Sequence, residues 1–219
     1  MTNRWIFFDI DGTLLYAHRV GREAFSQAFR EAFGWEQSVS HINFHGATDA
    51  GVLRAIAAER GEKLTAEQEQ KFFECLAPAI EKRLAENLPE VFPGVKPLLE
   101  KLAPSWNLGI VTGNIEPTAK LKLHYAGLLN FFSPHGFGTG SDHEDRAEIA
   151  RAVLNRTGNP SSCVLIGDTP NDINAAKKNN MISIAVATGG FIAGELVSAD
   201  AVFENFFDLP PVINFLERA

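Results

Sequence analysis

Short apolar runs recur along this chain of 219 residues, and segments with helical patterning separate them. The runs are WIFF before Asp9, WNLGIVT from Trp106, FFSPHGF from Phe131, CVLIG from Cys163, MISIAVAT from Met181 and a weaker AVF from Ala201. Helical patterns fit between them over about 116–127, 144–157 and 170–179. Because strands that alternate with helices form parallel sheets covered on both faces, the pattern predicts an α/β fold.

One long segment interrupts this alternation. Between about residue 17 and residue 88 there is no convincing strand pattern, only helical signals such as the apolar stripe of Phe25, Ala28, Phe29, Ala32 and Phe33. Thr48 or Asp49 is expected to cap one helix that ends near Gly61, and TAEQ from Thr65 has the form of a capping box. Pro78 is expected to kink or break the helix that follows.

These patterns predict two domains. Residues 1–16 and 89–219 are expected to form the α/β core, and residues 17–88 are expected to form a helical domain inserted after the first strand. The two crossings, near residues 15–19 and 87–94, are predicted to act as a hinge.

Composition limits the classes of function. Hydrophobic residues make up 45% of the chain and charged residues 21%, which is typical of soluble globular proteins. A formal net charge of −7 without a basic cluster argues against nucleic acid or a membrane surface as partner. No apolar run approaches the length of a membrane span, and Asp9 interrupts the only one near the N-terminus. We therefore expect a cytoplasmic protein, with Cys75 and Cys163 as small core residues.

Acids and hydroxyls follow three of the predicted strands. They are found in DIDGT from Asp9, in TGN from Thr112 and in GDTPND from Gly167. Ligands of open parallel sheets bind at the carboxyl ends of the strands, so these side chains are expected to converge. Asp9, Asp11 and Asp168, with Asp172 nearby, carry too much negative charge to lie together without a cation, and carboxylate oxygens favour Mg²⁺.

The first of these motifs has a useful spacing. Side chains two residues apart on extended backbone face the same way, so Asp9 and Asp11 can address one substrate. Gly12 permits a sharp turn after the strand, and the Thr13 hydroxyl can donate a hydrogen bond to a carboxylate.

DIDGTLL, Thr112 in IVTGN, and IGDTPND together resemble the motifs of the haloacid dehalogenase-like (HAD) superfamily of hydrolases. FHGATD and the residues from GDTPND to AVATGG look most like the phosphoglycolate phosphatase-like branch. The resemblance covers the whole chain. It implies a Rossmann-like parallel-sheet core with helices on both faces and an all-helical cap inserted after the first strand. It also implies Mg²⁺-dependent hydrolysis of a small phosphate monoester.

The resemblance assigns roles to residues of this chain. It implies that Asp9 attacks phosphorus to form an aspartyl-phosphate, and that Asp11 protonates the leaving oxygen and then activates water. Thr112 and the amides of Gly113 and Asn114 would hold the phosphoryl oxygens.

The resemblance also implies a metal site. Mg²⁺ would be held by the Asp9 carboxylate, the Asp11 main-chain carbonyl and Asp168, with Asp172 supporting these ligands. Asp11 further favours phosphoryl transfer, because dehalogenating relatives lack an acid at that position.

One position departs from the family pattern. The family usually has a Lys about two dozen residues before the GD motif, where this chain has Arg146 and no Lys between Lys122 and Lys177. Arg146 is predicted to supply the missing positive charge, although its planar guanidinium differs in geometry from an ammonium group. The alternative is an exposed helical Arg146 paired with Glu148 or another neighbour, which would put catalysis in doubt.

The predicted partner is a small phosphorylated metabolite, and the chain is expected to be a monomer or a small homo-oligomer. Arg22 and His45 are predicted to contact this substrate, with an exposed loop residue as the alternative for His45. Three other functions stay open: a phosphomutase or pyrophosphatase on the same core, a phospho-acceptor module that resembles receiver domains, and a scaffold that has lost catalysis.

Overall fold

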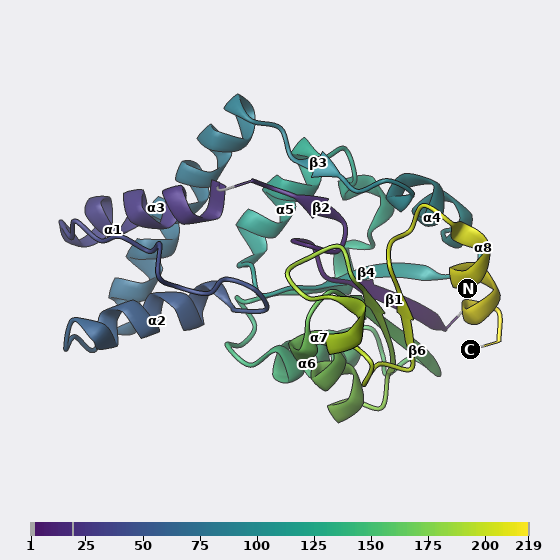
Figure 1. Cartoon of the computed structure of the whole chain (residues 1–219). Coiled ribbons are helices and arrows are strands. Elements are labelled where there is room, and N and C mark those ends of the chain that lie inside the picture. The colour runs from purple at the N-terminus through teal and green to yellow at the C-terminus, as the bar shows by residue number, and fades with distance from the viewer. Residues whose placement is uncertain (1–2, 19, 219) are drawn as a thin grey trace.

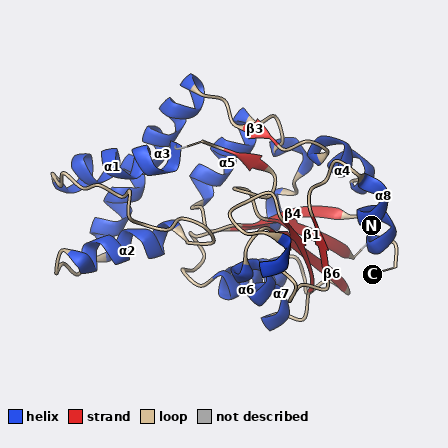
Figure 2. Cartoon of the chain, viewed as in Figure 1, coloured by secondary structure: helices blue, strands red, loops and turns tan. Residues whose placement is uncertain are grey.

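A computed structural model describes residues 3–18 and 20–218 (Figure 1). Its centre is a six-stranded sheet in the order β5-β4-β1-β6-β7-β8, in which every neighbouring pair is parallel (Figure 2). The strands are β1 (Arg4–Phe8), β4 (Asn107–Val111), β5 (Phe137–Gly138), β6 (Ser162–Gly167), β7 (Ile182–Val186) and β8 (Ala201–Phe203). This arrangement confirms the predicted α/β fold with a parallel sheet.

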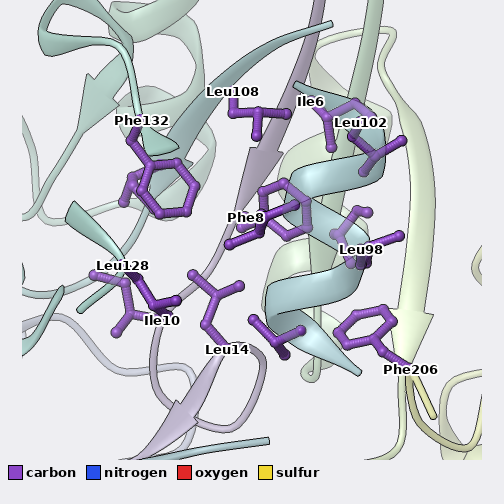
Figure 3. Close-up of a cluster of buried hydrophobic side chains, with 14 of the residues drawn as sticks. Ile6, Phe8, Ile10, Leu14, Leu98, Leu102, Leu108, Leu128, Phe132 and Phe206 are labelled. Atoms are coloured by element: carbon purple, nitrogen blue, oxygen red, sulfur yellow. The ribbon is translucent and has the colours of Figure 1, made fainter. Parts of the chain in front are cut away.

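Both faces of the sheet are covered by helices. Ile6 and Phe8 of β1 point to the face that packs against α4 (Val95–Leu102), α5 (Glu116–Tyr125) and α8 (Leu209–Leu216), where Leu98, Leu102 and Phe206 surround them (Figure 3). Trp5 and Phe7 point to the opposite face, which is covered by α6 (Arg146–Arg156) and α7 (Pro170–Lys178). The period of two along β1 thus gives each face its own apolar core.

A helical insertion follows the first strands and projects from the sheet (Figure 1). It consists of α1 (Val20–Phe33), α2 (Asp49–Glu59) and α3 (Ala66–Glu86), and it has a separate apolar cluster. The aromatic stripe of α1 packs on α3, where the rings of Phe29 and Phe72 lie 4.6 Å apart. Burial of these rings stabilises the insertion, whose apolar cluster also includes Ile115 at the start of α5 in the core.

The chain crosses between sheet and insertion at a small antiparallel pair. β2 (Leu15–Tyr16) pairs with β3 (Glu90–Val91), so the outgoing and returning segments are hydrogen-bonded side by side. The pair lies where the sequence places the hinge. The domain boundaries at residues 16 and 89 and the hinge motion stay predictions.

Several local expectations are confirmed. Thr48 caps α2 by accepting from the Gly51 amide, and Gly61 after that helix has a φ of +74°. Thr65 and Gln68 form the expected capping box at the start of α3. The predicted helices near 116–127, 144–157 and 170–179 correspond to α5, α6 and α7.

Three expectations about the backbone need correction. FFSPHGF forms a strand only at Phe137–Gly138, after two 3₁₀ turns, because Pro134 cannot donate to a sheet ladder. Pro78 does not break α3, which runs without interruption to Glu86; Pro78 lies on the exposed face, where water can bond the carbonyl that lacks a partner. The patterns also missed α4 and α8, each of which has a proline within its first three residues.

Within residues 3–18 and 20–218, no helix has both the length and the apolar character that crossing a bilayer requires. The cytoplasmic location stays a prediction. Cys75 and Cys163 are half-buried, and they pack against different apolar clusters.

Candidate active site

The loops that follow β1, β4 and β6 meet at the carboxyl edge of the sheet, beneath the insertion. A cavity of about 380 Å³ lies between the two parts. The core contributes Asp9, Asp11, Thr112 and Arg146 to its lining, and the insertion contributes apolar side chains such as Phe25. The convergence expected from the three motifs is therefore present.

Three acids form a buried cluster at this edge. Asp9 follows β1, Asp168 follows β6, and Asp172 lies in the first turn of α7. One carboxylate oxygen from each lies within 4.8 Å of the others, and none of the three residues is more than 4% exposed. Asp11 does not belong to this cluster through its side chain.

Arg146 lies inside the same cluster. Its Nη1 is 2.7 Å from Asp172 Oδ1 and 3.0 Å from Asp9 Oδ1, and it also donates to the Val111 carbonyl. The side chain is only 6% exposed. The alternative of an exposed Arg146 is therefore wrong, because the side chain is buried, and Glu148 pairs instead with Arg151.

One guanidinium does not balance three carboxylates. Burial raises the pKa of Asp9 to about 6, against the lowering effect of Arg146, and the charges of Asp172 and Asp11 raise it further. Burial also raises the pKa of Asp168 to about 8, and the neighbouring Asp9 and Asp172 add to this increase. The surrounding protein therefore disfavours the ionised forms of Asp9 and Asp168.

The open oxygens of the cluster fit a divalent cation. Asp9 Oδ1 is fully buried and accepts no hydrogen bond from the described residues, although Arg146 lies 3.0 Å away. Both oxygens of Asp172 are occupied, one by Arg146 and the other by the amide and hydroxyl of Thr169. Asp168 accepts from the Thr13 hydroxyl at 2.9 Å through Oδ1, as the sequence suggested for Thr13 and a carboxylate. Asp9 and Asp168 thus have capacity for a hard cation, while Asp172 orients its neighbours.

Two glycines allow the chain to pack closely around Asp168. A side chain on Gly12, where φ is +86°, would place its Cβ 2.4 Å from Asp168 Oδ2. A Cβ on Gly189 would lie 1.7 Å from the same oxygen. Gly12 therefore provides the expected turn, and larger residues at either position would displace the carboxylate.

Asp11 has a different set of partners. Its Oδ2 accepts from Lys122 Nζ at 2.6 Å and from Asn114 Nδ2 at 2.8 Å. Lys122 also donates to Asn114 Oδ1 at 2.7 Å, and Asn114 donates to the Thr112 hydroxyl oxygen. Asp11, Lys122 and Asn114 thus form a closed ring of hydrogen bonds, and Thr112 is attached to it through Asn114.

The sequence patterns did not single out Lys122. A signal was present, because Ile115, Ala119 and Leu123 mark the buried face of α5, and Lys122 lies beside Leu123 on that face. A lysine on the buried side of a helix next to a predicted catalytic loop needs an acidic partner.

The insertion contacts the catalytic loops through the start of α2. The Asp49 amide donates to the Gly113 carbonyl at 2.9 Å, and Asp49 Oδ2 accepts from the Ile115 amide at 2.8 Å and the Thr118 hydroxyl at 3.3 Å. Asp49 thereby caps α5, which has no capping side chain of its own. A Cβ on Gly113 would lie 2.2 Å from the Ala47 carbonyl oxygen, so the two backbones are in direct contact.

Arg22 and His45 both line the cavity. Arg22 donates through Nη1 to the carbonyls of Val39 and Ser40, and its guanidinium lies 4.8 Å from the centre of the Phe44 ring. His45 is exposed and lies against Gly190. The structure brings both to the cavity, and substrate contact stays a prediction for each.

Comparison with known proteins points to one family. The model of the haloacid dehalogenase-like hydrolases matches residues 4–180. A phosphoglycolate phosphatase of Synechococcus elongatus is 30% identical over 148 residues, which are 65% of this chain and 69% of that protein. The pyrophosphatase PpaX of Oceanobacillus iheyensis is 24% identical over 193 residues, 85% of each chain.

Solved structures share the fold over nearly the whole chain. CbbY from Rhodobacter sphaeroides in complex with phosphate superposes with a TM-score of 0.77 at 19% identity, covering 96% of this chain and 97% of that one. A hydrolase from Pseudomonas syringae gives a TM-score of 0.66 at 26% identity, with 98% of each chain covered.

Proposed function

The chain belongs to the haloacid dehalogenase-like hydrolases, and from this premise we propose that it is a Mg²⁺-dependent phosphatase for a small phosphate monoester. The observation that carries the proposal is the buried cluster of Asp9, Asp168 and Asp172, in which Asp9 keeps an oxygen without a hydrogen bond. Of the three acids, Asp9 lines the covered cavity, so its carboxylate is placed for nucleophilic attack on a phosphoryl group.

Asp9 is the proposed nucleophile. Its carboxylate forms a bond to phosphorus as the bond from phosphorus to the leaving oxygen breaks, which gives an aspartyl-phosphate. Arg146 holds Asp9 in place at 3.0 Å and offsets negative charge at the reacting phosphoryl group. Water then attacks phosphorus and releases inorganic phosphate and free Asp9.

Asp11 is the proposed general acid and base. It gives a proton to the leaving oxygen in the first step and takes one from the attacking water in the second. Its side chain is 41% exposed and lines the cavity, so it can reach a substrate that Asp9 attacks.

The phosphoryl oxygens would be bound by the loop that follows β4. The Thr112 hydroxyl oxygen accepts from Asn114, which leaves the hydroxyl proton available for a phosphoryl oxygen. The amides of Gly113 and Asn114 are the other proposed donors.

Mg²⁺ would be held by the carboxylates of Asp9 and Asp168 and the main-chain carbonyl of Asp11, with Asp172 supporting them. When bound, it supplies positive charge that keeps the carboxylates ionised and offsets the charge of the phosphate.

The substrate is proposed to be a small phosphorylated metabolite, because the cavity is closed on one side by the insertion. Arg22 and His45 are the proposed contacts to its non-phosphate part. Phosphoglycolate is one candidate, given the relative of that name, and the PpaX relative makes pyrophosphate a second.

The decisive experiment is a screen of phosphorylated metabolites, phosphoglycolate and pyrophosphate with the wild-type protein and Asp9→Asn. Release of phosphate with Mg²⁺, its loss on chelation and its loss in a folded Asp9→Asn variant are expected. Retained turnover in that variant would overturn the mechanism. Labelled phosphate that returns to a sugar rather than to water would instead identify a phosphomutase. Absence of release from every compound would favour the phospho-acceptor or non-catalytic alternatives.

A further inference from the structure

We propose that Lys122 is a positioning residue that holds the Asp11 carboxylate in its orientation toward the leaving group of the substrate. This role rests on the proposed function, because it concerns the general acid of the same reaction. Neither the sequence motifs nor the likeness to known proteins singles out Lys122.

The contacts of Lys122 are unusual for a lysine. The side chain is only 6% exposed, and it lines the cavity from α5. Its Nζ lies 2.6 Å from Asp11 Oδ2 and 2.7 Å from Asn114 Oδ1. A buried ammonium group is retained only where its partners compensate for lost hydration, so this position is specific to a charged donor.

Asp11 needs such a support. It lies in the turn after β1, and its side chain is 41% exposed, so the backbone alone does not restrict its rotamer. Lys122 and Asn114 both donate to Oδ2, which leaves Oδ1 without a partner among the described residues. The two donors therefore fix one oxygen and leave the other for the substrate.

Lys122 is itself held by a rigid element. It lies on α5, and Asp49 of the insertion caps the first turn of that helix. Removal of the ammonium group would leave Asn114 as the one side-chain donor to Asp11 among the described residues, and would loosen the orientation of Asp11 without touching Asp9, Asp168 or Arg146, which belong to the separate cluster. The defect should therefore fall on leaving-group protonation, and nucleophilic attack should be spared.

The test compares two substrates of the wild-type enzyme, an alkyl phosphate and an aryl phosphate. An alkyl alcohol leaves poorly without a proton, whereas an acidic phenol leaves well without one. Lys122→Met should lower kcat/KM for the alkyl phosphate by about 100-fold, the scale of general acid catalysis, and for the aryl phosphate by less than about 10-fold. Lys122→Arg should restore part of the loss.

The controls separate positioning from folding. Lys120→Met changes an exposed lysine on the same helix and should leave both reactions unchanged. In an Asp11→Asn background, Lys122→Met should add almost no further loss, since the group that it positions is already inactive. Equal losses on both substrates in Lys122→Met, with wild-type thermal stability, would overturn the role of Lys122 alone. A wild-type protein that releases phosphate from no compound of the screen would instead overturn the proposed function.

Discussion

The two aspartates proposed to be catalytic, Asp9 and Asp11, are separated by one residue, yet their surroundings differ in charge balance. Asp9 shares a single guanidinium, that of Arg146, with two other buried acids. Among the described residues, Asp11 is the one carboxylate that accepts a hydrogen bond from the ammonium group of Lys122. The first group has three carboxylates for one guanidinium, whereas the hydrogen bonds of the second pair one carboxylate with one ammonium group.

The difference indicates how far the protein itself offsets the charge of each aspartate. Around Asp9, burial raises the pKa values of Asp9 and Asp168, and one Asp9 oxygen is buried without a hydrogen bond, which fits the proposed role of a cation in offsetting the charge of these carboxylates. Around Asp11, Lys122 and Asn114 both donate to the carboxylate, and Lys122 also donates to Asn114. Preorganised groups lose little free energy on reaction, so the Asp11 group is suited to orient rather than to bind.

The largest expected effect is on the Asp9 group. Arg146→Met would leave Asp9 and Asp172 buried without a cation, which costs about 3–5 kcal/mol of unfolding free energy. It should also lower kcat/KM by about 10²–10³-fold, the scale for removal of one electrostatic stabiliser. Urea unfolding and steady-state kinetics measure the two losses.

A matched control lies on the same helix. Arg151 is exposed and pairs with Glu148, so Arg151→Met should change the unfolding free energy by no more than about 1 kcal/mol. If Arg146→Met were as mild as this control, the view that one guanidinium offsets the buried acids would be wrong.

A second prediction concerns Mg²⁺ and pH. The folded-state pKa values of Asp9 (about 6) and Asp168 (about 8) lie above the ordinary value near 4. In the absence of a cation, their contribution to stability is present below pH ~4 and is lost as pH rises through 6 and 8. Mg²⁺ binds the ionised carboxylates, so its stabilising effect should grow over that range.

Thermal unfolding with Mg²⁺ or with chelator checks this directly. The difference in Tm between the two conditions should be larger at pH 8 than at pH 6, and Asp168→Asn should remove most of it. A Tm difference that is independent of pH and survives in Asp168→Asn would place the cation elsewhere.

The sequence predicts the part of this site that depends on strand ends. Asp9, Thr112 and Asp168 each follow an apolar run, and the edge of a parallel sheet must bring such residues together. The resemblance to the family predicts Arg146 at the place of the usual Lys before the GD motif, and its burial between Asp9 and Asp172 supports the charge role proposed for it.

The remaining features depend on contacts between distant segments. Lys122 lies 111 residues from Asp11, so no local pattern pairs them, and only its place on the buried face of α5 signals a partner. The capping of α5 by Asp49 requires the insertion to dock in one orientation, which helical periodicity does not specify. The effects of Pro134 and Pro78 were also hard to predict, because the effect of a proline on a strand or helix depends on which neighbouring backbone groups lose a hydrogen bond and whether water can reach them.

The smallest expected effect tests how the insertion meets the Asp11 group. Burial raises the pKa of Asp49 to about 6, against the lowering effects of nearby Lys122 and the Ile115 amide. A raised folded-state pKa means that ionisation of Asp49 costs stability as pH rises from about 4 to 6.

Asp49→Asn keeps an acceptor for Ile115 without that cost. Its Tm relative to wild type, both in chelator, should therefore be higher at pH 7 than at pH 4.5, by a few degrees at most. An Asp49→Asn difference that stays constant or falls as pH rises would mean that the Asp49 carboxylate contacts α5 in its ionised form, with Lys122 balancing both Asp49 and Asp11.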